Sequence, residues 1–211
     1  MRNIPTFPVM LLLAFSLISC QKELSFESPS PGNNKPASLL GVWKFNELTT
    51  AVESGTSFDY GGVPGRIVAT YATTTLNNKG ILTITADKME TTNLGYAIVT
   101  DVKVKAYAGG ILVDEQEDHI DFELPSSSAS SDYQQIGSDS LYFPNGSIFD
   151  IPDTNGQQLP GASEPFGARY AISGDTLFIQ SALNRSAITI QNGVEYEITQ
   201  KVDGVSSFIR Q

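Results

Sequence analysis

The chain has one histidine and one cysteine, so the residue types that most often perform chemistry are scarce. The histidine lies in the run Glu117-Asp118-His119-Ile120-Asp121. A lone histidine cannot build a multi-histidine metal site, and no Gly-x-Ser-x-Gly motif supplies a nucleophile for it to activate. A carboxylate pair for glycoside hydrolysis stays open, because the separation of two acids is invisible in a sequence. We expect no enzymatic activity, no cofactor and no metal site.

The cysteine stands at the end of an apolar leader. Arg2 precedes an apolar run over Val9–Ile18, which is too short for a membrane span and has the length of a secretory signal. This run ends in Leu17-Ile18-Ser19-Cys20, which resembles the lipobox of bacterial lipoproteins. The resemblance implies that residues 1–19 are a signal peptide, that cleavage precedes Cys20, and that Cys20 then carries the lipid that anchors the protein.

The residues that follow the cysteine predict a tether. Residues 20–38 are rich in Ser, Pro and Asn, so we expect a lipidated flexible segment. Gln21-Lys22-Glu23 resembles the signal that sends lipoproteins to the cell surface in one group of Gram-negative bacteria, although Leu24 and Ser25 stand where that pattern has further acids. The resemblance implies an outer-membrane protein on either the periplasmic or the surface side.

Negative charge is concentrated in one segment of a chain whose net charge is −10. Residues 106–168 hold eleven acids and no Lys or Arg. So acidic a chain is a poor partner for phosphate backbones, which excludes nucleic-acid binding. The segment is a solvated face, a surface that an anionic membrane repels, or a calcium loop around Asp150, Asp153 and Asn155. The EF-hand pattern fails at Gln158, where it needs Gly.

Residues 39–211 predict a single all-β domain, because apolar and polar residues alternate as they do in antiparallel strands with one wet face. The pairs Gly109-Gly110, Gly174-Asp175, Asn192-Gly193 and Asp203-Gly204 each separate two such runs and predict tight hairpins. No window shows a helical period. The expected strands are residues 41–50, 66–76, 80–87, 96–107, 111–124, 169–173, 176–182, 187–191, 194–202 and 206–210.

The first expected strand begins Leu39-Leu40-Gly41-Val42-Trp43-Lys44-Phe45. Gly-x-Trp at this position resembles the start of lipocalins and lipocalin-like proteins, and residues 170–177 resemble a hairpin common in short bacterial lipocalin-like lipoproteins. The resemblance implies an up-and-down β-barrel whose end motif is Gly41, Trp43 and a basic residue of the last strand, for which Arg210 is the candidate. The alternative is a β-sandwich in which Trp43 is an ordinary core aromatic.

Two features depart from true lipocalins. Nothing resembles their helix before the last strand, and residues 125–168 form a long irregular insertion. Within the insertion, residues 139–143 and 147–151 flank Pro144-Asn145-Gly146 and predict an extra hairpin. Tyr142, Phe143 and Phe149 either contact a partner from its tip or pack the hairpin onto the barrel.

These patterns predict a lipid-anchored envelope protein that binds a small or hydrophobic ligand in a lipocalin-like barrel. The expected ligand-binding residues are Val102, Val104, Ile120, Phe122, Tyr196 and Ile198. Large side chains that fill the barrel would leave no cavity, and the sequence does not decide between these cases. The second hypothesis is a surface module that binds an envelope protein or a glycan through the acidic insertion. It predicts that residues 126–161 can be deleted without loss of the fold. The oligomeric state is not predicted.

Overall fold

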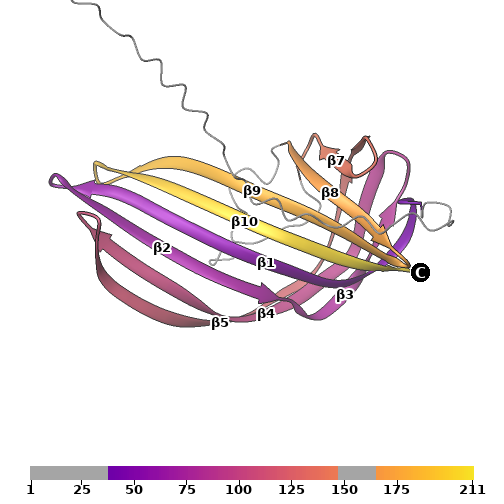
Figure 1. The fold of residues 1–211 in the computed structure, drawn as a ribbon, viewed down its shortest axis with the longest axis horizontal. Coiled ribbons are helices and arrows are strands. Elements are labelled where there is room, and N and C mark those ends of the chain that lie inside the picture. Colours follow the sequence, from indigo (N-terminus) through magenta and orange to yellow (C-terminus); the bar gives the residue numbers. More distant parts are fainter. Residues whose placement is uncertain (1–37, 147–164) are drawn as a thin grey trace, which may run out of the picture. The chain divides into compact units, whose positions relative to one another are not determined.

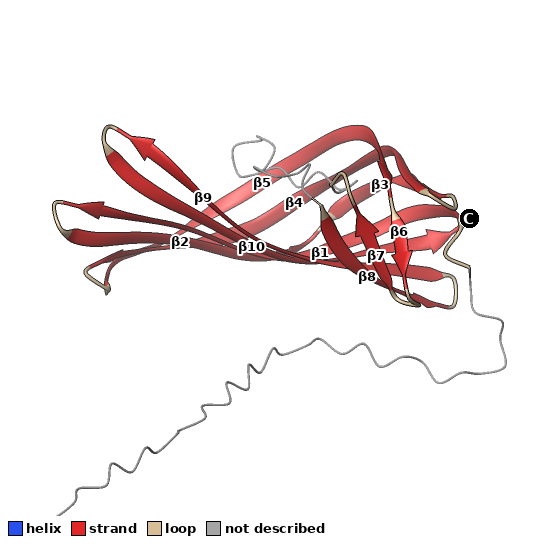
Figure 2. Ribbon diagram, turned by 90° about the horizontal axis from the view of Figure 1, so that it is seen from above, coloured by secondary structure: helices blue, strands red, loops and turns tan. Residues whose placement is uncertain are grey.

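The computed structural model describes residues 38–146 and 165–211, and all of its regular elements in these ranges are strands of one antiparallel sheet (Figures 1 and 2). This confirms the predicted all-β class. The strands are β1 (Gly41–Tyr60), β2 (Val63–Thr74), β3 (Leu76–Ile84), β4 (Lys88–Ala108), β5 (Ile111–Asp132), β6 (Gln134–Ile136), β7 (Ser140–Phe143), β8 (Phe166–Ser173), β9 (Thr176–Gln191) and β10 (Val194–Arg210).

The strands are ordered as a meander in which β1 joins the two halves of the sheet. On one side of β1 lie β2 and β3, followed by β4 and β5; on the other side lie β10, β9, β8, β7 and β6. β2 and β3 share one position, since β2 pairs with residues 49–60 of β1 and β3 pairs with residues 41–44. β5 and β6 stand at opposite ends of this order, yet only Tyr133 separates them in the chain. The sheet therefore curls until its two ends approach each other.

The sheet bends where β2 gives way to β3. The Thr75 backbone N–H donates to the Leu48 carbonyl oxygen at 2.9 Å, and the Thr75 hydroxyl accepts from the Leu48 N–H at 2.9 Å. Asn77 takes a φ of 53°, and β1 has a bulge between Phe45 and Glu47 at a similar level. Bulges increase local twist and bend a strand, so the bulge in β1 and the irregular backbone around Asn77 let the long strands curve at this point.

The core lies at one end of the sheet, which we call the core end. Trp43, Leu82, Leu177 and Phe208 are fully buried there. The Phe45 ring links three strands, with its centroid 5.5 Å from that of Phe208 on β10 and 6.2 Å from that of Tyr96 on β4. We call the face that carries these side chains the inner face and the opposite one the outer face.

Three long hairpins extend beyond this core to the other end, which we call the tip end (Figure 1). They turn at residues 61–62, 109–110 and 192–193, and the φ angles of Asn192 (52°) and Gly193 (78°) match a type I′ turn. The predicted turns Gly109-Gly110 and Asn192-Gly193 are thus confirmed, and so is Gly174-Asp175, which joins β8 to β9. Large apolar residues of these hairpins are exposed, among them Tyr60, Val63, Ile111, Val113, Ile188 and Ile190.

The fourth predicted turn, Asp203-Gly204, is wrong. These residues lie inside β10, which runs unbroken to Arg210, and β9 is likewise continuous where we expected two strands. Gly204 is the partner of Thr50 on β1 and of Ser181 on β9, so β10 has a neighbouring strand on both sides at this position. Pairing on both sides outweighs the local turn propensity of the dipeptide.

The segment that we expected to be an irregular insertion, residues 125–168, is partly regular sheet. β5 continues to Asp132, and Tyr133, Leu141 and Phe143 are core residues. β7 pairs with β6 and β8, which leaves no edge for the predicted partner strand 147–151, a range outside the described residues. Phe143 therefore packs in the core, where its ring stacks on that of Phe166 at 4.8 Å. Tyr142 is partly exposed, and Phe149 lies outside the described residues.

Candidate functional site

The aromatic residue and the basic residue of the predicted end motif are in contact. Trp43 and Arg210 are direct partners in the β1–β10 register, and the Arg210 guanidinium carbon lies 4.1 Å from the centroid of the Trp43 ring. Gly41 takes a φ of 138°, and a Cβ at this position would lie 3.2 Å from Arg210 Nη1. A glycine here therefore leaves the guanidinium room to lie over the indole.

The segment before β1 completes this contact. The Trp43 indole N–H donates to the Leu39 carbonyl oxygen at 3.0 Å, and the Arg210 guanidinium donates to the carbonyl oxygens of Ser38 and Leu40. Trp43 is fully buried, and a buried indole N–H needs a hydrogen-bond partner, which the Leu39 carbonyl oxygen provides. The arginine thus ties the last strand to the residues that enter the first one.

The six residues that we expected to bind a ligand share the inner face. Residues two apart on a strand and direct cross-strand partners lie on the same face. Ile120 pairs with Thr100 and Phe122 with Ile98, which places both on the face of Val102 and Val104. The register from β4 through β2 and β1 to β10 places Tyr196 and Ile198 there as well.

The six residues differ in exposure, and the difference does not follow distance from the core. Val102 is buried; Val104, Ile120, Phe122 and Tyr196 are half-buried; the Ile198 side chain is 43% exposed. Past the core the inner face is partly exposed and mixed in character, because the register also places polar residues on it, namely Ser54, Thr56, Gln116, Asp118 and Gln200. This accessible part of the inner face, from Val102 to Ile198, is the candidate ligand site.

One aromatic pair on this face was missed by the sequence reasoning. The Phe58 and Tyr196 ring centroids are 5.6 Å apart, and the Phe58 ring lies over Gly65, where a Cβ would be 2.5 Å from Phe58 Cε2. A glycine directly opposite an aromatic residue on the adjacent strand indicates that the ring lies over the glycine, but this signal can be read only once the register is known. Phe58 adds flat apolar area beside Tyr196.

The histidine lies on the outer face, away from this site. His119 pairs with Asp101 in the β4–β5 register, and His119 Nδ1 lies 2.7 Å from Asp101 Oδ1. Both side chains are more than half exposed. Among the described residues, no three His, Cys, Asp or Glu side chains are placed to hold a metal ion.

Three tyrosines titrate above their ordinary range. Burial raises the pKa of Tyr71 on the inner face. Burial, then Tyr170 and Asp87, raises the pKa of Tyr133, whose hydroxyl donates to the Thr85 carbonyl oxygen at 2.7 Å. Burial and the Asp139 carboxylate raise the pKa of Tyr170. These groups stay neutral at physiological pH and are structural.

Several predictions about function fall on residues that the structure does not describe. Cys20, the tether and the candidate calcium residues Asp150, Asp153 and Asn155 lie outside residues 38–146 and 165–211. Within those two ranges the structure has no helix long and apolar enough to cross a membrane. Comparison with known proteins finds no match to any family model, curated sequence or solved structure.

Proposed function

We propose that the protein is a lipid-anchored lipoprotein of the bacterial outer membrane that holds a small hydrophobic ligand on the inner face of a lipocalin-like barrel. The main evidence for a ligand is the composition and exposure of the inner face. Six residues that were chosen from the sequence share this face, and all of them except Val102 are at least partly exposed. Apolar and aromatic side chains with a few polar groups among them are typical of the lining of a ligand site.

The strand order supports the barrel over the sandwich. All ten strands belong to one sheet. Most pairings join strands that are consecutive in the chain, and the exceptions are β1 with β10, β1 with β3, and β2 with β4. A sandwich needs two stacked sheets, usually joined by Greek-key connections, whereas an up-and-down barrel needs one curled sheet. The Trp43–Arg210 contact also supports the barrel, because the lipocalin resemblance implies such a contact at the barrel end.

The anchor is proposed from the leader alone. The lipobox resemblance assigns the lipid to Cys20, and several acyl chains on one residue hold a protein at a membrane because each buried CH₂ contributes about 0.8 kcal/mol. The second hypothesis, a module acting through a removable acidic insertion, is not supported. Its deletion range 126–161 includes the core residues Tyr133, Leu141 and Phe143.

The ligand proposal is tested by titration with N-phenyl-1-naphthylamine, an apolar probe whose fluorescence rises in a dry environment. We expect saturable binding that Ile198→Asp weakens at least about tenfold, which corresponds to about 1.4 kcal/mol. Ile209→Asp is the matched control, because Ile209 is 42% exposed, against 43% for Ile198, but lies on the outer face. Equal binding by the two variants would refute an inner-face site.

A further inference from the structure

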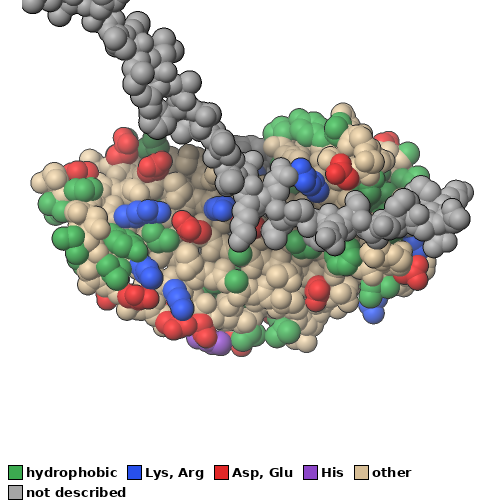
Figure 3. Space-filling view, in the orientation of Figure 1, with side chains coloured by type: hydrophobic (Ala, Val, Ile, Leu, Met, Phe, Trp, Pro, Cys, Tyr) green, Lys and Arg blue, Asp and Glu red, His purple; other side chains and the backbone are tan. Residues whose placement is uncertain are grey.

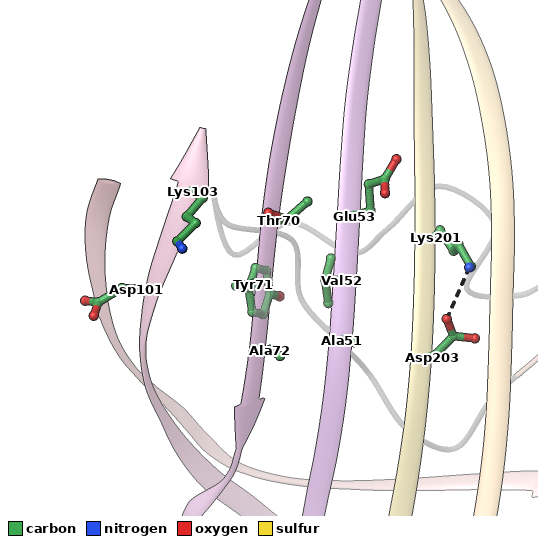
Figure 4. Close-up of a pocket in the computed structure, with 10 residues that line it drawn as sticks. All are labelled: Ala51, Val52, Glu53, Thr70, Tyr71, Ala72, Asp101, Lys103, Lys201 and Asp203. Atoms are coloured by element: carbon green, nitrogen blue, oxygen red, sulfur yellow. Dashed lines mark ion pairs between the residues drawn. The ribbon is translucent and has the colours of Figure 1, made fainter. Parts of the chain in front are cut away.

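Two grooves are lined mainly by side chains of the outer face. Val52 and Tyr71 in the first groove, and Phe58 and Gly65 in the second, belong to the inner face by register. The first, near the middle of the long strands, has a volume of about 440 Å³, and Figure 4 shows its lining from the four neighbouring strands β10, β1, β2 and β4. The second lies toward the tip end of the same strands and has a volume of about 720 Å³. Both volumes are in the range of small-molecule sites.

Small residues make the floor of these grooves and longer ones make the walls. On the two central strands, Ala51 pairs with Ala72, and both side chains face outward. The wall on β10 carries Lys201 and Asp203, whose side chains form an ion pair at 3.6 Å. The wall on β4 carries a second lysine and a second aspartate, Lys103 and Asp101. The wall strands are three strand spacings apart, or ~14 Å.

One ion pair links the linings of the two grooves. Glu53 lines the first groove, Arg66 lines the second, and their charged groups lie 3.7 Å apart across the floor. Both side chains are more than half exposed, so water screens the pair and its stabilising effect is small. The two grooves lie end to end along β1 and β2 on the same face, and we call them together the trough. From Ala51 to Asp59 it spans eight residues of β1, or ~26 Å.

The trough offers hydrogen-bonding groups of both signs. Positive and negative side chains are interspersed over this face (Figure 3). Lys103, Glu195 and Glu197 form no ion pair with any residue in the described ranges, so their charged groups are available to a ligand. At the tip end, Tyr107 lies in the same cross-strand row as Glu197 and adds an aromatic wall.

These features favour one class of ligand. A polyanion or polycation would meet like charges along the whole trough. An extended peptide usually joins a sheet through a free edge, but the floor strands β1 and β2 are hydrogen-bonded on both sides. Sugar hydroxyls both donate and accept, so they can pair with ammonium and carboxylate groups alike, and a sugar ring can lie against an aromatic side chain.

We propose that this outer-face trough binds a neutral glycan chain. The proposal does not depend on the inner-face ligand, because none of the six inner-face residues lines the trough. The full-length protein is tested against neutral cello-, malto-, xylo- and manno-oligosaccharides, with a uronic-acid oligosaccharide and an extended peptide alongside them. Binding is measured by isothermal titration calorimetry.

Ala51→Phe fills the exposed floor, and Ser186→Phe places the same side chain on an exposed outer-face position of β9 outside the trough. We expect a neutral oligosaccharide to bind the native protein and the Ser186→Phe variant equally, and Ala51→Phe to weaken it at least about tenfold. An unchanged circular dichroism spectrum and an unchanged urea unfolding midpoint of Ala51→Phe show that the fold is intact. Binding of no neutral oligosaccharide, binding only of the acidic glycan or the peptide, or equal binding by both variants overturns the proposal.

Discussion

The contact between Trp43 and Arg210 makes a quantitative prediction about stability. Arg210→Met keeps an apolar stem over the indole but removes the cation and the hydrogen bonds to the carbonyl oxygens of Ser38 and Leu40. A cation over a buried indole contributes about 1 to 2 kcal/mol, and each hydrogen bond at this partly exposed place about 0.5 to 1 kcal/mol. We therefore expect Arg210→Met to lower the free energy of unfolding by about 2 to 4 kcal/mol.

The assay uses the chain's only tryptophan. Because Trp43 is fully buried at the core end, its emission during urea unfolding reports on this region. The matched control is Arg66→Met, which removes an exposed ion pair with Glu53 and should cost less than about 1 kcal/mol. Tyrosine emission or circular dichroism follows the same unfolding in variants without the tryptophan.

A double-mutant cycle isolates the ring contact from the hydrogen bonds. Combining Arg210→Met with Trp43→Phe should give a coupling free energy of about 0.5 to 2 kcal/mol. A coupling below about 0.3 kcal/mol would mean that the cation does not act on the ring. A loss in Arg210→Met no greater than in Arg66→Met would refute the assignment of Arg210 as the tie between the first and last strands.

Three further predictions concern backbone, pH and anchor. Gly80→Ala should lower the free energy of unfolding by more than about 2 kcal/mol, because Gly80 has a φ of 122° and a Cβ there would lie 2.6 Å from the Leu94 Cα. Gly167→Ala is the control: the nearest atom to its added Cβ is 3.8 Å away, so urea unfolding should show almost no change in stability. Tyr133→Phe should lower the free energy of unfolding by about 1 kcal/mol at pH 7 and reduce the loss of stability at alkaline pH. The pKa of Tyr133 is higher in the folded than in the unfolded chain, so this group stabilises the fold fully below pH ~10 and ceases to do so as pH rises through the folded-state pKa. Cys20→Ala should leave the precursor uncleaved and unlabelled by radioactive palmitate.

Each of these predictions has a contrary result. Equal stability of the two glycine variants would show that the close approach of β3 and β4 at Gly80 is absent. An unchanged alkaline unfolding midpoint in Tyr133→Phe would remove Tyr133 from the groups that link stability to pH. Normal processing of Cys20→Ala would exclude the lipobox assignment.

The sequence predicted the faces of the strands better than their lengths. The alternation that selected Val102, Ile120 and Tyr196 requires only local periodicity, and the register places all three on one face. The far half of β1 was missed because Ala51–Tyr60 is rich in small and polar residues that give neither face an apolar signal. Such a stretch becomes a strand because β2 and β10 supply backbone partners on both sides.

The same reason explains the segment that we expected to be an insertion. The serine run before Asp132 shows no apolar alternation, but β4 supplies its hydrogen bonds. Tyr133, Leu141 and Phe143 are recognisable as core residues only once β5, β6 and β7 bring them beside the rest of the core. Long-range pairing, which no local window contains, decided these elements.

The most direct test of the proposed function is native mass spectrometry of the full-length protein isolated gently from membranes. The account predicts an organic adduct that survives purification, is lost on denaturation, and is absent from Ile198→Asp but present in Ile209→Asp. The mass of the adduct would identify the ligand class. An unliganded chain that also fails to bind N-phenyl-1-naphthylamine would contradict the account, because the accessible apolar part of the inner face would then hold no ligand.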